Sequence, residues 1–373
     1  LAALGLFFSM APLCGGVAHG LLWLAALPCE FIINLLNFVA GLGLFSEPTF
    51  VEPLPSILLA FAVLILVLFQ FRGREKGTRG QKIFLLAVFP LLLLTPALRL
   101  TNVLDDELRL EALDVGQGQA ILLSYRGIKI LVDGGGSPPE EFDMGKNVLG
   151  PVLASNESPR ADALINSHPD LDHLGGFFHI LKTFKVGALF HNGQEADKRY
   201  ASLWLDLRLK NYGVVLSEGD LIRVGAPARG VKLEVLHPPA EGNFKGNDAS
   251  LVLRLRRGGE TLALLPGDAG PAALRRVAAE YPDLKTRVLV AAHHGSDKNF
   301  QEDFLQSASP EIALVSCGYD NIWNFPGETV KKWFADRRVP LLSTSALGRI
   351  RIGFRPDGTL AVWTALGAKD KSE

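Results

Sequence analysis

Residues 167–176 read SHPDLDHLGG, and this stretch decides how the rest of the chain is interpreted. Within six residues it holds four side chains of types that bind metal ions, namely His168, Asp170, Asp172 and His173. The apolar run at 163–165 leads in like a strand, and a glycine pair leads out. A core favours none of these four side chains, and turn capping by Asp does not explain two His at this spacing. The stretch predicts a loop at the end of a buried strand that can hold one or two divalent ions and activate water.

The overall composition points to no particular partner. The 373 residues carry 38 Lys and Arg against 39 Asp and Glu, a net charge of −1. A nucleic-acid binder is expected to show a basic surface, so bulk charge does not indicate one. Three Cys cannot form a disulfide framework, and we interpret them as small buried hydrophobic residues. The chain begins with Leu rather than Met, so we expect a fragment of a longer protein.

Residues 1–98 are far more apolar than the rest of the chain. A charge-free run of 18 residues covers 54–71, a shorter one covers 83–98, and Glu30 is the only charge in 1–45. Because a bilayer core needs about 20 apolar residues per helix, we predict spans at 54–71 and 83–98. Two helical segments are expected within residues 1–45. One of the two spans the membrane, enters and leaves it on the same side, or lies at its surface. Soluble helices need a polar face, which these runs lack.

The loop between the last two spans, RGREKGTRGQK at 72–82, predicts the orientation in the membrane. It holds five Lys and Arg against one Glu, and short loops of this composition stay in the cytoplasm. We therefore divide the chain into a transmembrane segment at 1–98 and a second domain at 99–373. The second domain is expected on the outer side of the membrane.

From residue 107 onward the pattern changes to short strands, turns and helices. The runs 120–124 and 128–132 flank a short turn and predict a hairpin. Short strands flanked by helices favour layered α/β packing, with functional residues on loops at one edge of the sheets. Further strands are expected at 108–113, 163–165, 231–236, 250–255, 261–265, 288–292, 312–316 and 349–354, and helices at 174–184, 200–212, 271–281, 300–307 and 328–337.

Four later segments place polar or metal-binding side chains at predicted strand ends. They are Asp133 in LVDGGG, Asn247 and Ser250 in NDAS, Asp268 in LLPGD, and the pair His293 and His294 in HHGS. A lone buried His is usually a core residue, but a His pair before Gly-Ser at a strand end is not typical of a core. We expect Asp268 and the His pair to complete the site that the 168–173 loop begins.

Together these motifs resemble the metallo-β-lactamase superfamily. HPDLDH resembles its metal loop, LVDGG its first motif, PGD its bridging-aspartate motif and HHGS its late histidine motif. DVGQG at 114–118, SHPDLDHLGG, NDAS, AHHGS and the segment 321–326 also resemble, in that order, the ComEC branch of competence proteins of DNA uptake. Residues 1–98 are similar in apolar composition and position to the end of that family's membrane channel domain. The resemblance implies an α/β fold in which transmembrane helices precede a four-layer αβ/βα sandwich of two mixed sheets.

The resemblance also implies a role for each motif residue. Asp268 would bridge two ions, and at least one of His293 and His294 would face the metal. Asp170 or Asp172 would take the proton of the attacking water. The full set of expected metal ligands is His168, Asp170, Asp172, His173, Asp268, His293 and His294.

Five residues are expected around the ligands rather than among them. Asp133 would orient the loop through hydrogen bonds. Asp114 and Gln117 either line the mouth of the site or are structural. Asn247 and Ser250 belong to the motif beside the cleft.

Several departures from the family pattern bear on the metal. The superfamily usually has His where this chain has Asp170, and a carboxylate makes the site harder, so Mn²⁺ or Mg²⁺ is expected beside Zn²⁺. Phe325 stands where the ComEC branch more often has His. Asn247 stands where hydrolases of the superfamily place a third-site His, and Gln119 replaces an acid. We therefore expect that the site holds either one or two divalent ions.

The resemblance implies a multi-pass protein of the bacterial plasma membrane that takes part in DNA internalisation. Its extracytoplasmic domain would hydrolyse phosphodiester bonds of incoming DNA while a single strand enters, alongside other components of an uptake machinery. Two alternatives stay open. One is a membrane-tethered, metal-dependent hydrolase of another substrate. The other is a non-catalytic binding domain whose site has decayed, as Phe325 indicates.

Overall fold

The computed structural model describes residues 104–155, 159–225 and 230–366. The membrane spans predicted within 1–98, the basic loop between them and the predicted domain boundary lie outside the described residues. Among the described residues, no helix is long and apolar enough to cross a bilayer.

In the described part of the chain, eight strands form the first sheet in the order β17-β16-β1-β2-β3-β5-β7-β8. The strands from β17 to β3 pair antiparallel, and those from β3 to β8 pair parallel. The predicted hairpin is present as β2 and β3. The bounds are β1 Leu108–Ala112, β2 Ile121–Tyr125, β3 Ile128–Val132, β5 Ala163–Asn166, β7 Leu189–His191, β8 Val214–Val215, β16 Ile350–Phe354 and β17 Leu360–Thr364.

The second sheet is mixed as well, with the order β15-β14-β13-β12-β11-β10-β9 over the residues described. Its β12, β13, β14 and β15 run parallel, and the remaining pairs are antiparallel. The bounds are β9 Leu221–Arg223, β10 Val231–His237, β11 Val252–Arg257, β12 Glu260–Leu265, β13 Val288–Val290, β14 Ile312–Val315 and β15 Leu341–Ser343, while β4 Arg160–Ala161 and β6 Lys185–Val186 pair separately.

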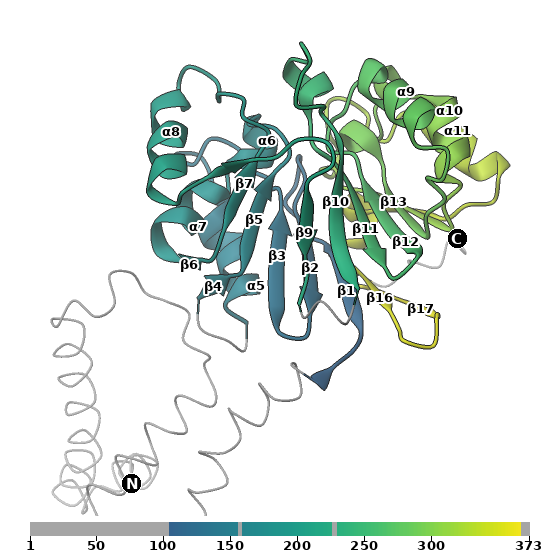
Figure 1. Cartoon of the computed structure of the whole chain (residues 1–373), viewed down its shortest axis with the longest axis horizontal. Coiled ribbons are helices and arrows are strands. Elements are labelled where there is room, and N and C mark those ends of the chain that lie inside the picture. Colours follow the sequence, from purple (N-terminus) through teal and green to yellow (C-terminus); the bar gives the residue numbers. More distant parts are fainter. Residues whose placement is uncertain (1–103, 156–158, 226–229, 367–373) are drawn as a thin grey trace, which may run out of the picture. The chain divides into compact units, whose positions relative to one another are not determined.

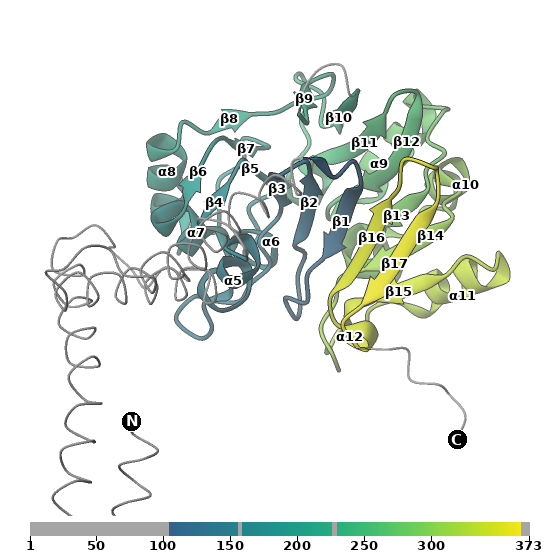
Figure 2. The same cartoon turned by 90° about the horizontal axis from the view of Figure 1, so that it is seen from below.

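Helices cover the outer face of each sheet (Figures 1 and 2). The helices α7 and α8 lie beside the first sheet, and α9, α10 and α11 lie beside the second. Their bounds are α5 Gly150–Leu153, α6 Leu171–Leu174, α7 Phe177–Thr183, α8 Ala201–Lys210, α9 Pro271–Glu280, α10 Glu302–Ala308, α11 Glu328–Asp336 and α12 Thr344–Leu347.

The predicted helix at 174–184 is broken by the glycine pair after the metal loop. The helix α6 ends at Leu174 and α7 begins at Phe177. A Cβ on Gly176 would lie 2.3 Å from the carbonyl oxygen of Gly134, so the two loops touch backbone to backbone. This contact seats the metal loop against the loop that follows β3.

The hydrophobic core has three layers, as a four-layer sandwich requires. The middle layer joins both sheets, with Leu110 and Ile352 from the first and Leu253 and Leu265 from the second, all almost fully buried. The outer layers pack helices on each sheet, around Phe177 and Trp204 on one side and Phe304 and Phe334 on the other. The predicted αβ/βα sandwich is therefore present.

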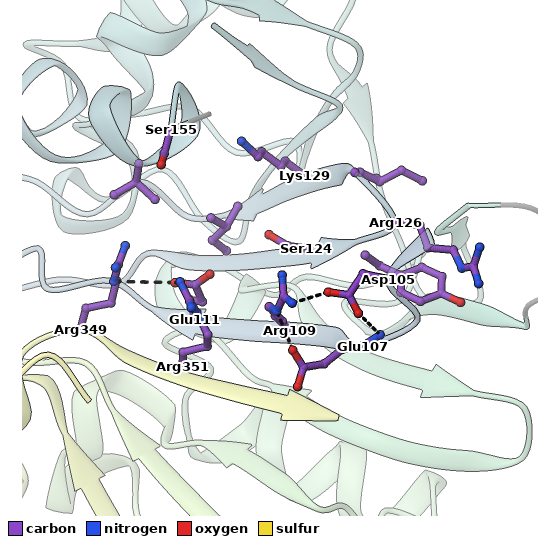
Figure 3. A pocket seen from close by; sticks show the side chains of 15 residues that line it. Asp105, Glu107, Arg109, Glu111, Ser124, Arg126, Lys129, Ser155, Arg349 and Arg351 are labelled. Atoms are coloured by element: carbon purple, nitrogen blue, oxygen red, sulfur yellow. Dashed lines mark hydrogen bonds and ion pairs between the residues drawn. The ribbon is translucent and has the colours of Figure 1, made fainter. Parts of the chain in front are cut away.

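On β1, the side chains that alternate with the core residues point away from the core between the two sheets. Arg109 and Glu111 line a charged cavity of about 210 Å³ on the outer face of the first sheet (Figure 3). Glu111 is 5% exposed and forms an ion pair with Arg351 at 3.2 Å and another with Arg349 at 3.7 Å. Charge pairs thus hold this part of the sheet, and Val152 of α5 borders the same cavity.

Candidate metal centre

The metal loop begins where β5 ends and is closed by the short helix α6. The backbone N–H groups of His173 and Leu174 donate to the carbonyl of Asp170, which turns the chain sharply. The turn brings the imidazole rings of His168 and His173 to 4.3 Å between centroids, and both side chains are fully buried. Asp170 stays 58% exposed at the surface of the loop.

Four side chains from three loops meet at one point. Oxygen and nitrogen atoms of Asp172, His173, Asp268 and His294 all lie within 4.8 Å of one another. Asp268 Oδ1 lies 3.0 Å from His173 Nε2, and Asp268 Oδ2 lies 3.6 Å from His294 Nε2. Asp172 Oδ2 lies 3.3 Å from His294 Nε2. We call these four residues the metal group, a set drawn from the loops after β5, β12 and β13.

Buried atoms without partners show that this donor set fits a divalent cation. The Nε2 atoms of His168, His173 and His294 and Oδ1 of Asp268 are buried, and their polar neighbours are one another and the carboxylates of the loop. An unpaired buried polar atom costs free energy, and native structures contain few of them. Imidazole nitrogens and carboxylate oxygens are the common protein ligands of Zn²⁺, and the carboxylates also suit Mn²⁺.

Asp133 holds the metal loop from behind. Its carboxylate lies 2.8 Å from His173 Nδ1 and accepts hydrogen bonds from the backbone N–H and hydroxyl of Ser167, at 2.7 and 2.8 Å. The amide of Gln119 donates to the same carboxylate at 2.9 Å. A carboxylate on the far nitrogen of an imidazole fixes which ring nitrogen faces a metal. Asp133 is fully buried and follows β3 directly.

His294 is oriented by the backbone of the neighbouring loop. Its Nδ1 lies 2.8 Å from the carbonyl oxygen of Ser316, so the N–H of Nδ1 donates there and Nε2 faces the metal group. His293 and His294 both have positive φ, of 49° and 56°, a backbone region that non-glycine residues seldom occupy. Such strain is concentrated at functional sites.

The sequence left the choice between the two His open, and the structure separates them. His294 is 2% exposed within the metal group. His293 has a 29% exposed side chain, its Nε2 lies 3.7 Å from Asp268 Oδ2, and its Nδ1 lies 3.2 Å from the amide of Asn247. His293 therefore borders the group and connects it to the NDAS motif.

A second set of expected ligands is less complete. His168 Nε2 lies 3.5 Å from Asp170 Oδ2 and 4.0 Å from Asp268 Oδ2. Within the described ranges, the metal group is the single cluster whose donor atoms all come within 4.8 Å of one another. The geometry thus offers one closely packed site, the metal group. Asp268 belongs to it and also lies near the more widely spaced pair of His168 and Asp170.

Charge at the metal group is strongly coupled. Burial alone would raise the pKa of Asp268, but His173 and His294 beside it hold the pKa well below its usual value. Burial would lower the pKa of His173, whereas Asp268 and Asp133 raise it well above its usual value. The carboxylate of Asp268 thus stays charged although it is buried, and the charged form is the one in which carboxylates bind metal ions.

Other expected residues lie near the group without joining it. Asp114 is exposed, and its side chain accepts a hydrogen bond from Gly116 N–H at 3.5 Å. Gln117 accepts one from the N–H of Gly318 at 3.3 Å, which joins two loops. Ser250 is fully buried, and its hydroxyl makes no hydrogen bond.

Three further His lie in other environments. His179 pairs with Asp143 at 3.6 Å, and His237 Nε2 lies 2.7 Å from the carbonyl oxygen of Asp248. His191 packs edge-on against Trp204, and burial lowers its pKa to about 4. None of the three is in the metal group.

Sequence reasoning missed three residues that position the metal loop and its neighbours. Ser167 ties the loop to Asp133, Gln119 donates to the same carboxylate, and Ser316 supplies the carbonyl that orients His294. None of these residue types stands out in a sequence. Gln119 differs from the family pattern, and that difference is the one signal the sequence offers.

Comparison with known proteins agrees with the architecture. The family model described as "Metallo-beta-lactamase superfamily" matches residues 113–319. ComE operon protein 3 of Bacillus subtilis (strain 168) is 28% identical over 92% of this chain and 45% of its own length. Competence protein ComA of Neisseria gonorrhoeae is 29% identical over 89% of this chain and 43% of its own. The chain thus spans less than half the length of these two relatives.

Among solved structures, Igni18, a metallo hydrolase from Ignicoccus hospitalis KIN4/I, aligns with a TM-score of 0.42 at 15% identity, over 68% of this chain and 98% of its own. The sequence match over 113–319 covers the metal loop, Asp268 and both His of HHGS. The competence proteins match almost the whole chain. This chain therefore belongs to the metallo-β-lactamase superfamily, and within it resembles the ComEC-type competence proteins.

Proposed function

We propose that the metal centre hydrolyses phosphodiester bonds of DNA during uptake, while a single strand enters the cell. The observation that carries the proposal is the metal group, whose four donors converge and whose buried Nε2 and Oδ1 atoms have no other partner. The likeness to two competence proteins over about nine tenths of the chain supports the choice of substrate.

Each residue of the centre has a part in this proposal. Asp172, His173, Asp268 and His294 would hold one divalent ion, and His168 and Asp170 would share Asp268 in holding a second. Bound ions would lower the pKa of water and offset charge on the phosphate oxygens. Asp133 keeps Nε2 of His173 turned toward the group through its contact with Nδ1.

Asp170 is the residue proposed to receive the proton of the attacking water. Its side chain is 58% exposed, so one carboxylate oxygen can take the proton while the other holds the second ion, whereas Asp172 lies against His294 inside the metal group. In the reaction the water oxygen bonds to phosphorus, its proton passes to an Asp170 carboxylate oxygen, and the bond from phosphorus to the leaving oxygen breaks. The leaving oxygen then takes a proton from solvent or from Asp170.

Domain organisation and membrane topology form a second part of the proposal. We place a transmembrane segment at 1–98 and the metal-centre domain at 99–373, outside the cytoplasm, because the loop at 72–82 is strongly basic. A reporter fused after residue 100 should be active on the outer side of the membrane. Activity only in the cytoplasm would contradict this topology.

A nuclease assay tests the proposed chemistry. The full chain, purified in detergent, is incubated with labelled single- and double-stranded DNA and with Mn²⁺, Zn²⁺, Mg²⁺ or a chelator. Cleavage should need the metal, and Asp268→Asn should slow it roughly 100-fold or more. Asp206→Asn changes an exposed acid on α8 and serves as the control.

The outcomes separate the alternatives. Metal-dependent cleavage of a non-nucleic phosphate or acyl ester, with DNA left intact, would replace DNA as the substrate. A chain that binds metal and cleaves nothing would be a binding domain.

A further inference from the structure

The loop between β14 and α11 carries large apolar side chains that are exposed to solvent. Tyr319 is 87% exposed, Ile322 is 84% exposed and Trp323 is 56% exposed. Burying such side chains is favourable, and an exposed apolar cluster often marks a binding surface. We call Trp323 and Phe325, whose rings stack on one another, the aromatic row.

Hydrogen bonds hold this loop in a fixed shape. The side chain of Asn321 donates to the carbonyls of Gly318 and Phe325, at 3.0 and 2.9 Å, and accepts from the N–H of Phe325 at 2.7 Å. The N–H of Gly327 donates to the carbonyl of Gly295, which follows the two His. The exposed aromatic side chains are thus presented by a braced loop.

The row leads away from the metal centre. The ring of Phe325 lies 6.1 Å from those of His293 and His294, between centroids. The indole of Trp323 stacks on Phe325 at 6.2 Å with planes only 14° apart. An aromatic surface therefore runs from the border of the metal group to the exposed face of Trp323.

We propose that Trp323, backed by Phe325, stacks on an unpaired nucleobase of a DNA single strand held at the metal centre. This inference rests on the proposed function and names the form of its substrate. Nucleobases stack on aromatic side chains whatever their identity, and such stacking is a main source of affinity for single strands. In a duplex the base faces are already covered, so the row selects a single strand.

Charge favours stacking over phosphate contact at this loop. Residues 318–328 contain no Lys or Arg, while Asp320 and Glu328 are exposed. A phosphate-binding loop would carry cations, and so would a loop that docks on an anionic membrane. The row therefore contributes to affinity through bases, and removing Trp323 should leave the salt dependence of binding unchanged.

Binding measurements on the full chain in detergent test the proposal. The probes are oligo-dT and an abasic strand of the same length, both with Ca²⁺ in place of a catalytically active ion. The wild-type chain should bind oligo-dT roughly ten-fold more tightly than the abasic strand. Trp323→Ala should remove that difference, and Trp323→Phe should restore most of it. The slope of log Kd against log salt should be the same in all three chains.

Tyr212→Ala is the matched control, because Tyr212 is 88% exposed but follows α8 rather than β14. It should bind both strands as the wild type does. Equal binding of the two strands by the wild type would overturn the aromatic row. So would a Trp323→Ala chain that keeps the preference, or one that loses affinity for both strands equally.

Cleavage kinetics keep this proposal separate from the previous one. With an active metal, Trp323→Ala should raise KM for oligo-dT about ten-fold and act on kcat much less. Metal-dependent cleavage with unchanged KM in this variant would contradict the proposed role of the aromatic row, while the proposed nuclease activity would stand. An affinity that depends on the bases, without any cleavage, would contradict the proposed nuclease activity and support the role of the aromatic row.

Discussion

Asp133 is the residue on which the orientation of the metal loop depends most. It contacts His173, Ser167 and Gln119 with one buried carboxylate. Asp133→Asn keeps the shape but replaces one acceptor oxygen with a donor, so His173 loses its fixed orientation. We expect metal affinity to fall about 10- to 100-fold, read from the metal concentration needed to raise the melting temperature.

Asp143→Asn is the matched control, because Asp143 also pairs with a His, His179, but this pair lies near the surface and outside the metal group. It should leave metal affinity unchanged. Equal affinities for the Asp133 variant and the wild type would show that this carboxylate does not position a ligand.

His191 predicts a pH dependence away from the metal centre. Burial lowers its folded-state pKa from 6.5 to about 4, so the unfolded chain binds more protons between these values. Its contribution to stability is complete above about pH 6.5 and is lost as the pH falls toward 4. Between pH 7 and pH 5 the wild type should lose about 1–2 kcal/mol more than His191→Gln in urea unfolding. Parallel curves for the two chains would refute this assignment.

The residues of the metal loop were accessible to sequence reasoning because they are close together. His168, Asp172 and His173 fall within six positions, which no packing rule explains. Ser167 and Ser316 were not accessible, since a common residue type acts there through contacts 34 and 22 positions away. The choice of His294 over His293 depends on two positive φ angles, which sequence patterns do not indicate.

At the scale of elements, the predicted strands follow the alternation of buried side chains. The strands β1, β10, β12, β14 and β16 were expected within one residue of their observed bounds. Seven strands were missed because they are short or half exposed, which weakens the apolar pattern; they are β4, β6, β7, β8, β9, β15 and β17. The gap between α6 and α7 was missed because periodicity alone does not register backbone contact.

That gap gives a prediction about Gly176. A methyl group there would meet the carbonyl of Gly134 at 2.3 Å, so Gly176→Ala must push the metal loop from the β3 loop. Unfolding free energy should fall by about 1–3 kcal/mol in urea titration. Gly259→Ala, whose Cβ would meet nothing within 4 Å, should change it by less than about 0.5 kcal/mol. A well-tolerated Gly176→Ala would mean that the two loops are not in close contact.

The outer face of the first sheet gives a second prediction at this scale. Glu111 is buried beneath Arg349 and Arg351, which are each about one third exposed (Figure 3). Glu111→Ala leaves both cations without their shared partner, and partial exposure limits the cost to about 1–3 kcal/mol in urea unfolding. Restoring stability by the added change Arg351→Ala would support the pairing. A single variant as stable as the wild type would contradict it.

At the scale of the whole molecule, the sandwich brings together loops that are distant in sequence. Asp133, Asp172, Asp268 and His294 each follow or lie near the end of a strand, and these ends meet at one edge between the two sheets. Motif order and resemblance predicted this arrangement. The interatomic distances did not follow from the sequence, because they depend on how the two sheets pack through their shared core.

The proposed function depends above all on whether the metal group holds a divalent ion. Elemental analysis of the full chain after dialysis measures this, with Asp268→Ala beside the wild type. We expect one to two tightly held Zn or Mn ions per wild-type chain, a metal-dependent rise in melting temperature, and loss of both in the variant. A wild-type chain that holds no metal and melts at the same temperature with and without added ions would show that the metal group is not a metal centre.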